Sequence, residues 1–123
     1  SFASAANYLK RIGWKKNQPC FYEVELKDEI PEKYLNSSAK KIKNKKRVKF
    51  FKKYLKSSES LLNVNDNIYS AIIIPDKDII PGAKNLKPAY IIFSNYEQIL
   101  KWNRSLRFAL AVCTLKGQFE NEI

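Results

Sequence analysis

The chain has 123 residues, of which 45% are apolar, 13% aromatic and 28% charged. An apolar fraction of this size supports one modest hydrophobic core, which excludes a globally disordered chain. Its apolar runs fall far short of the ~18 residues of a membrane span. The sequence has no histidine and two cysteines, a composition that disfavours a zinc site.

The formal net charge of +11 is concentrated in one stretch. Between Lys40 and Lys56 the sequence has ten Lys or Arg residues and no acid, whereas the remaining 13 basic and 12 acidic residues nearly cancel. Such a run can bind nucleic acid, a teichoic-type glycan or anionic lipid headgroups. It can also be a solvated face of a lysine-rich protein, and we favour this second interpretation because nothing beside the run supplies base-reading chemistry.

The first predicted element is an amphipathic helix over residues 2–13. Gly13 would supply a left-handed C-terminal cap, and Trp14 would fold back on the helix end. Tyr8 falls outside the apolar stripe, so it either faces a groove or is half-buried core. The residues of the stripe share one face: Ala5, Ala6, Leu9 and Ile12.

Three strands are predicted, over residues 21–26, 68–74 and 89–93, and they suggest a small antiparallel sheet. The first alternates apolar and polar residues, which places Glu23 and Glu25 on one face roughly 7 Å apart. Two carboxylates at this spacing could be a catalytic pair. Alternation of this kind is typical of a solvated strand face, and that interpretation is favoured.

The segments between the strands are mostly predicted loops. Residues 29–44 and 57–67 are polar, and residues 76–87 form a turn-rich link in which Asp76 and Asp78 are turn residues.

Residues 45–55 are predicted to form a short basic helix. Val48, Phe51 and Leu55 recur at helical spacing and would face inward, with the lysines facing outward.

The two cysteines, Cys20 and Cys113, leave two interpretations open. They could form a disulfide in an oxidising compartment, or they could be two small buried apolar residues. The second is favoured.

Two helices are predicted at the end of the chain, and their apolar residues are Tyr96, Ile99 and Leu100, then Leu106, Ala109, Leu110 and Cys113. The connector is Trp102-Asn103-Arg104-Ser105, where Asn103 or Ser105 can cap the second helix. A corner that only joined two helices would more often be rich in Gly or Pro. An aromatic ring and an amide also suit a sugar site, because the ring stacks on the sugar and the amide pairs with its hydroxyl or acetamido groups.

This C-terminal stretch carries a resemblance to a known family. The segments Asn95-Tyr96, Ile99-Leu100-Lys101-Trp102-Asn103-Arg104-Ser105 and Phe108-Ala109-Leu110-Ala111-Val112 resemble the C-terminal signature of lytic murein transglycosylases of the membrane-bound B type. The segment Ala5-Ala6-Asn7-Tyr8-Leu9-Lys10, followed by Gly13-Trp14, independently resembles an N-terminal segment of the same family.

The resemblance implies a peptidoglycan enzyme with a lysozyme-like fold. Family members cleave the bond between N-acetylmuramic acid and N-acetylglucosamine and form a 1,6-anhydro product, and one glutamate acts as acid and then as base. In the family that glutamate precedes the Asn-Tyr helix, and this chain has no counterpart of it. We therefore predict no catalytic residue in this chain and no activity by the chain alone.

The resemblance also implies four residues that line the glycan cleft. Tyr8, Trp102, Asn103 and Phe108 match family positions that contact or stack on sugar, although Phe108 is equally consistent with a core residue. The implied partner is a peptidoglycan glycan strand, and no cofactor or metal is implied.

The predicted fold class is α+β, with the terminal helices of a lysozyme-like domain and a small antiparallel β-rich insertion. Residues 1–14 and 94–123 would belong to the lysozyme-like domain, and residues 15–93 would form the insertion. Because the chain opens at Ser1 directly on a helical pattern, we expect a segment of a longer polypeptide. An upstream lysozyme-like segment would then complete it in the bacterial periplasm or cell envelope.

Two other functions remain open. The chain could be a basic nucleic-acid-binding module that uses Lys40–Lys56, or it could be an inactive remnant of a split gene.

Overall fold

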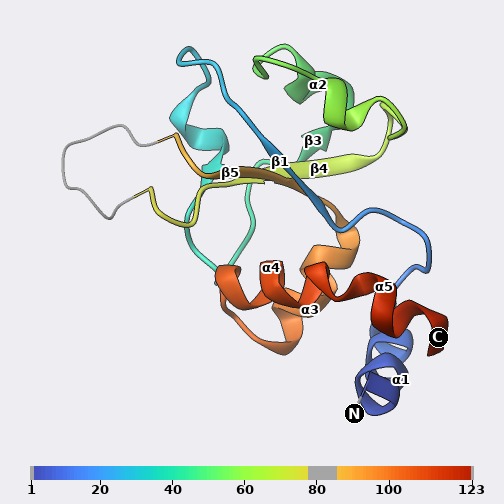
Figure 1. The fold of residues 1–123 in the computed structure, drawn as a ribbon. Coiled ribbons are helices and arrows are strands. Elements are labelled where there is room, and N and C mark those ends of the chain that lie inside the picture. The colour runs from blue at the N-terminus through green and yellow to red at the C-terminus, as the bar shows by residue number, and fades with distance from the viewer. Residues whose placement is uncertain (1, 78–85, 123) are drawn as a thin grey trace.

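The computed structural model describes residues 2–77 and 86–122, and the predicted turn at Asp78 and Pro81-Gly82 lies outside these residues. The elements, in chain order, are α1 (Phe2–Ile12), β1 (Phe21–Val24), the 3₁₀ turn η1 (Glu32–Tyr34), β2 (Leu35–Asn36), β3 (Lys46–Arg47), α2 (Val48–Lys52), η2 (Glu59–Leu61), β4 (Tyr69–Ile73), β5 (Ala89–Ile92), α3 (Ser94–Trp102), α4 (Leu106–Thr114), α5 (Lys116–Phe119) and η3 (Glu120–Glu122). The predicted α+β class is confirmed (Figure 1).

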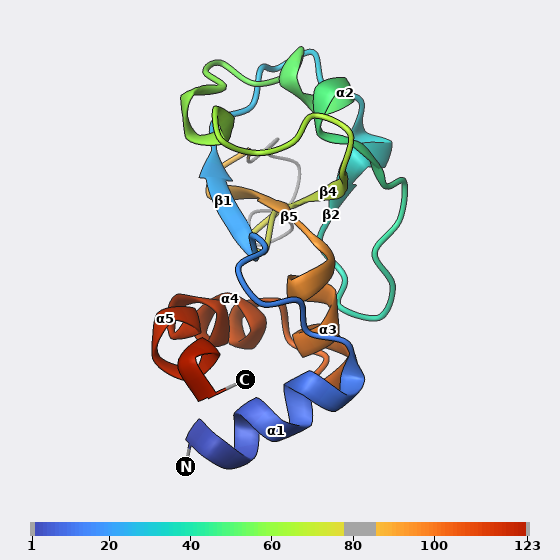
Figure 2. The same cartoon turned by 90° about the vertical axis from the view of Figure 1, so that its right-hand side faces the viewer.

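A small sheet lies in the middle of the molecule, between two groups of elements. The helices α1, α3, α4 and α5 lie on one side and form what we call the helical half (Figure 2). We call the sheet together with α2 and the loops around it the sheet half. The strand order is β1-β5-β4-β2, and β3 also pairs with β4.

The sheet is buried on both faces because successive residues of its central strands point in opposite directions. In β4, Ile73 belongs to a core shared with the helical half, whereas Ile72 belongs to a second core under α2. The facing residues of β5 follow the same rule, since Ile91 pairs with Ile72 and lies in the second core. A continuous apolar run is the sequence pattern expected for such a strand.

One predicted loop contains secondary structure. Residues 29–44 include η1 and β2, and Tyr34 and Leu35 within them are buried. The apolar pattern of this segment is interrupted by Asn36, which is buried because its side-chain amide forms hydrogen bonds with backbone groups. Its Nδ2 donates to the Ile72 carbonyl at 2.9 Å. Its Oδ1 also accepts from the Lys43 N–H at 2.8 Å.

The antiparallel sheet was predicted only in part. β1–β5, β4–β5 and β3–β4 are antiparallel, but β2 pairs with β4 in parallel. The first strand also ends at Val24, and beyond it Leu26 forms an isolated bridge with Leu55.

The basic helix is shorter than predicted. Helix α2 covers Val48–Lys52 because the two preceding residues extend the sheet as β3. Its predicted inward-facing residues are confirmed, since Val48, Phe51 and Leu55 are all buried in the second core.

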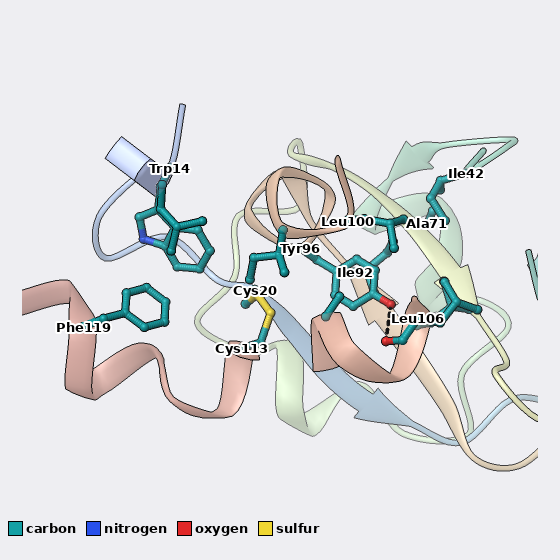
Figure 3. Packing of buried hydrophobic residues seen from close by; sticks show 14 of the residues in the cluster. Trp14, Cys20, Ile42, Ala71, Ile92, Tyr96, Leu100, Leu106, Cys113 and Phe119 are labelled. Atoms are coloured by element: carbon teal, nitrogen blue, oxygen red, sulfur yellow. Dashed lines mark hydrogen bonds between the residues drawn. A yellow bond between two sulfur atoms is a disulfide. The ribbon is translucent and has the colours of Figure 1, made fainter. Parts of the chain in front are cut away.

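The favoured interpretation of the cysteines is corrected. Cys20 and Cys113 are buried, as predicted, but they form a disulfide with Cα atoms 6.0 Å apart. It joins the residue before β1 to helix α4, so it ties the sheet half to the helical half (Figure 3).

Candidate functional site

Three aromatic side chains from separate helices form a series on the helical half. The ring centroids of Tyr8 and Trp102 are 5.3 Å apart with the planes tilted by 44°, and those of Trp102 and Phe108 are 5.9 Å apart at 81°. Tyr8 is 36% exposed and Trp102 45% exposed, whereas Phe108 is half-buried. We call these three residues the aromatic triad. Phe108 also packs against the core, as the second of its two predicted roles requires.

The corner between α3 and α4 places the fourth predicted residue beside the triad. Asn103 is exposed and ends α3 in an extended conformation, where its N–H donates to the Ile99 carbonyl at 3.0 Å. Within the described ranges, its side-chain amide forms no hydrogen bond. An exposed amide beside exposed rings can pair with hydroxyl or acetamido groups of a sugar.

Ser105, rather than Asn103, caps the second helix. Its Oγ accepts from the Phe108 N–H at 3.1 Å, and its N–H donates to the Asn103 carbonyl at 2.8 Å. The corner is therefore held by its own hydrogen bonds, while Asn103 keeps its side chain available.

A buried hydrogen bond supports the corner from behind. The Tyr96 hydroxyl donates to the Leu106 carbonyl at 2.9 Å and so joins α3 to the start of α4 (Figure 3). Burial raises the pKa of the Tyr96 phenol, which therefore remains a donor throughout the physiological range.

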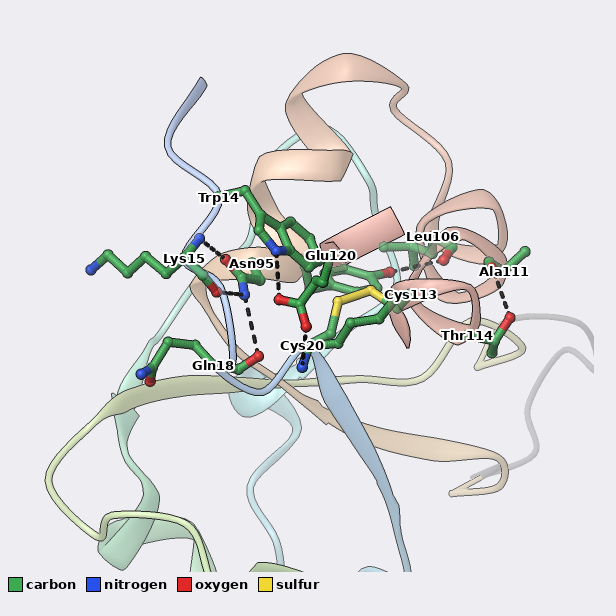
Figure 4. The surroundings of a disulfide bond; sticks show 12 residues. Trp14, Lys15, Gln18, Cys20, Asn95, Leu106, Ala111, Cys113, Thr114 and Glu120 are labelled. Atoms are coloured by element: carbon green, nitrogen blue, oxygen red, sulfur yellow. Dashed lines mark hydrogen bonds and ion pairs between the residues drawn. A yellow bond between two sulfur atoms is a disulfide. The ribbon is translucent and has the colours of Figure 1, made fainter. Parts of the chain in front are cut away.

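The predicted end of the first helix is confirmed, but the residues that Trp14 contacts there were not predicted. Gly13 ends α1 at φ 108°, a left-handed conformation that glycine adopts without strain. The chain then turns back, and the Trp14 ring packs on Phe119 with centroids 5.1 Å apart. The Trp14 Nε1 donates to Glu120 Oε2 at 2.9 Å (Figure 4).

Glu120 acts as a clasp between the two ends of the described chain. Besides Trp14, it accepts from the Asn17 N–H at 2.9 Å and pairs with the Lys116 ammonium at 3.0 Å. Burial alone would raise the pKa of the Glu120 carboxyl, but these bonds outweigh that effect and hold the pKa below its usual value.

Asn95 fixes the loop that follows the first helix. Its Oδ1 accepts from the Lys15 N–H at 2.8 Å, and its Nδ2 donates to the Lys15 carbonyl at 2.8 Å and to that of Gln18 at 3.3 Å (Figure 4). Asn95 is wholly buried, and a buried amide needs hydrogen-bond partners. Its presence in the family motif, directly before the apolar residues of α3, is the signal that could have indicated this positioning role.

Glu23, in β1, and Glu25, just after it, are both solvent-exposed. Glu23 and Glu25 border an open cleft of about 480 Å³ together with Lys56 and Glu59, and no residue of the aromatic triad lines this cleft. Among the residues described, no group of three or more His, Cys, Asp or Glu could hold a metal ion. No described helix is long and apolar enough to cross a membrane.

Comparison with known proteins gives a consistent result. Residues 1–116 match the family described as the transglycosylase SLT domain. The chain is similar to SltB3 from Pseudomonas aeruginosa, in a crystal structure with NAG-NAM-pentapeptide, at 26% identity and a TM-score of 0.69. It is also similar in fold to the soluble lytic transglycosylase SltB1 from Pseudomonas aeruginosa, at 20% identity and a TM-score of 0.62.

These similarities cover almost all of this chain but a minor part of the others. The match to SltB3 covers 95% of this chain and 29% of SltB3, and the match to SltB1 covers 96% and 35%. A search of curated protein sequences found no match.

Proposed function

Because this chain belongs to the transglycosylase SLT domain family, we propose that it forms one wall of the glycan site of a peptidoglycan lytic transglycosylase. The observation that carries this proposal is the aromatic triad beside Asn103. Tyr8 and Trp102 lie far apart in sequence, yet their exposed rings touch. The aromatic rings can stack on the apolar face of an N-acetylated sugar, and the free amide beside them can form hydrogen bonds with its hydroxyl or acetamido groups.

The proposed reaction is cleavage of the bond between N-acetylmuramic acid and N-acetylglucosamine with a 1,6-anhydro product. It needs a carboxylic acid whose pKa is raised by an apolar pocket, so that the acid can protonate the glycosidic oxygen. Glu120 is the one buried acid among the described residues, and its pKa is lowered. We therefore propose that the catalytic glutamate comes from polypeptide outside residues 1–123.

The proposed partner is a peptidoglycan glycan strand in the bacterial cell envelope. SltB3 has been crystallised with NAG-NAM-pentapeptide and with NAG-anhNAM-pentapeptide, which supports a ligand of this class. In this proposal residues 1–14 and 94–123 belong to a lysozyme-like domain completed by an upstream segment, residues 15–93 are its insertion, and the enzyme acts in the periplasm.

Co-sedimentation with purified peptidoglycan tests the proposed site. Trp102→Ala and Asn103→Ala should each weaken binding, the former about tenfold, or about 1.4 kcal/mol, because a stacking surface is removed. The matched control is Tyr69→Ala, which removes an exposed aromatic from the sheet half. Equal binding by Trp102→Ala and the unmodified chain would remove the triad from the proposed site.

A second measurement addresses the missing acid. Peptidoglycan incubated with this chain alone should release no 1,6-anhydro-muropeptides, as judged by mass spectrometry. Release of such products, abolished by one substitution within residues 1–123, would contradict the proposal that the acid lies elsewhere.

A further inference from the structure

On one face of the sheet half, lysine ammonium groups lie over aromatic rings in cation–π contacts. Lys33 Nζ lies 5.2 Å from the ring centroid of Tyr34, and Lys46 Nζ lies 5.2 Å from that of Phe50. Lys53 Nζ lies 4.1 Å from the centroid of Phe50 and 5.2 Å from that of Tyr54. We call these residues the lysine–aromatic face: Lys33, Tyr34, Lys46, Phe50, Lys53 and Tyr54.

The three rings form one continuous base for the three ammonium groups. Phe50 packs against Tyr34 at 5.3 Å and against Tyr54 at 6.0 Å between centroids, and Tyr34 is buried. A cation held over a ring is attracted by the ring quadrupole but keeps its charge. The lysines are thus ordered before any ligand arrives, which lowers the entropic cost of binding.

Internal acids neutralise little of the surrounding charge. Of the ten basic residues between Lys40 and Lys56, Lys45 pairs with Glu97 at 2.8 Å and Lys52 with Asp66 at 2.6 Å. Within residues 2–77 and 86–122, none of the three lysines of the lysine–aromatic face forms an ion pair. The surface around α2 is therefore a positive patch whose charge is available to a partner.

An exposed apolar side chain follows η2, on a loop that is bonded to α2. Leu62 is 73% exposed, and it belongs to the loop 57–67. This loop is bound to α2, because Asp66 accepts the Lys49 N–H at 3.0 Å through its carbonyl and the Lys52 ammonium through its carboxylate. A leucine side chain gains no binding energy from a soluble polyanion. At the headgroup boundary of an anionic bilayer, apolar and cationic side chains both contribute to binding.

Helix α2 and the helices α1, α4 and α5 lie at opposite ends of the molecule. In both ribbon views α2 and its loops are at one end, and α1, α4 and α5 are at the other (Figures 1 and 2). We propose that the lysine–aromatic face and Leu62 dock the sheet half on a bilayer containing anionic phospholipids. The helical half, which carries the aromatic triad, then lies on the side away from the lipid surface. This inference does not depend on the identity of the glycan.

Sedimentation with lipid vesicles tests this docking. The probes are vesicles of phosphatidylcholine alone and of phosphatidylcholine mixed with phosphatidylglycerol. The unmodified chain should bind the mixed vesicles only, and the binding should weaken as salt rises. Since each lysine near an anionic surface adds about a fivefold gain in partitioning, the triple variant Lys33→Gln, Lys46→Gln, Lys53→Gln should partition roughly a hundredfold less.

Two matched variants show whether a loss of binding comes from the lysine–aromatic face, from the change in net charge or from misfolding. The triple variant Lys10→Gln, Arg11→Gln, Lys101→Gln removes the same charge from exposed positions of the helical half and should lose much less binding. Replacing the three face lysines with arginine should preserve binding, because the charges stay over the rings. Equal losses in the two glutamine variants would overturn the proposal.

Leu62→Ser distinguishes a bilayer from a soluble polyanion. It should reduce vesicle binding while leaving any weak binding to inorganic polyphosphate or duplex DNA unchanged. Binding of polyphosphate or DNA as tight as binding of mixed vesicles, with Leu62→Ser having no effect on the vesicles, would overturn the proposal in favour of a polyanion-binding surface.

Discussion

The two halves of the molecule are held together in different ways. In addition to its apolar core, the helical half has two long-range links, the Cys20–Cys113 disulfide and the Trp14–Glu120 hydrogen bond, which join residues 93 and 106 positions apart. The second core, in the sheet half, is almost wholly apolar and keeps its charges on the outside. The exposed rings of the helical half thus need specific anchors, whereas the charged surface of the sheet half needs only a packed layer beneath it.

Removal of the disulfide should have the largest effect on the links that hold the helical half. In the chain-entropy description a cross-link over 93 positions stabilises by about 4.6 kcal/mol. The double variant Cys20→Ser, Cys113→Ser should therefore lose most of the stability of a small domain. Urea unfolding of this variant, compared with the unmodified chain with and without reductant, measures the loss. A reductant effect that persists in the double variant would show that the link is not its cause.

The apolar interior of the sheet half should respond to a single truncation. Phe51 is wholly buried, and Phe51→Ala should cost about 3–5 kcal/mol through lost burial and the cavity left behind. The neighbouring Phe50 is only half-buried, so Phe50→Ala is the matched control and should cost clearly less. Equal unfolding free energies for the two variants would mean that the second core is not close-packed.

The Glu120 clasp should make the helical half sensitive to acid. Its folded-state pKa is lowered, so its stabilisation is complete above the unfolded pKa of about 4.3 and is lost as pH falls through the folded value. Glu120→Gln should cost about 2 kcal/mol at neutral pH, because charged hydrogen bonds are lost. It should also flatten the dependence of stability on pH below about 5.

The control for the clasp is an acid that the fold does not bury. Glu59→Gln changes an exposed side chain and should leave the acid dependence as it was. Thermal melts from neutral to acidic pH provide the measurement. The same pH dependence in Glu120→Gln and the unmodified chain would assign acid sensitivity to other carboxyls.

The smallest expected effect concerns the helix cap at the corner. Ser105→Ala removes the side-chain acceptor of the Phe108 N–H and should cost about 1 kcal/mol, or roughly 4 °C in Tm. Ser94→Ala is the matched control, because Ser94 begins α3 without capping it through its side chain. Similar melting temperatures for the two variants would show that the cap does not hold the corner.

The predictable parts of the fold were those with a local pattern. The periodicity of Tyr96, Ile99 and Leu100 predicted α3, and the apolar run ending at Ile74 predicted β4. The parallel strand β2 was not predictable, because a buried Asn36 replaces the apolar residue that would have indicated it. The partners of Asn36 are backbone groups of Lys43 and Ile72, and no local pattern encodes them.

The candidate site was likewise predicted only where a sequence motif marks its residues. Tyr8, Trp102, Asn103 and Phe108 were predicted from family motifs, and the contact of Tyr8 with Trp102 agrees with their placement on one surface. The anchors that position this surface were not predicted. An aspartate or glutamate such as Glu120 near a chain end usually indicates a solvated residue, and two cysteines alone do not reveal whether they pair.

The meeting of Trp14 with Glu120 has a consequence for biosynthesis. Trp14 is translated long before Phe119 and Glu120, the residues on which it packs and to which it donates a hydrogen bond. The second core draws on residues from Val24 to Phe93, so the sheet half can assemble while translation continues. The exposed rings can therefore come together as one surface only after the sheet half, with its positively charged end, has been translated.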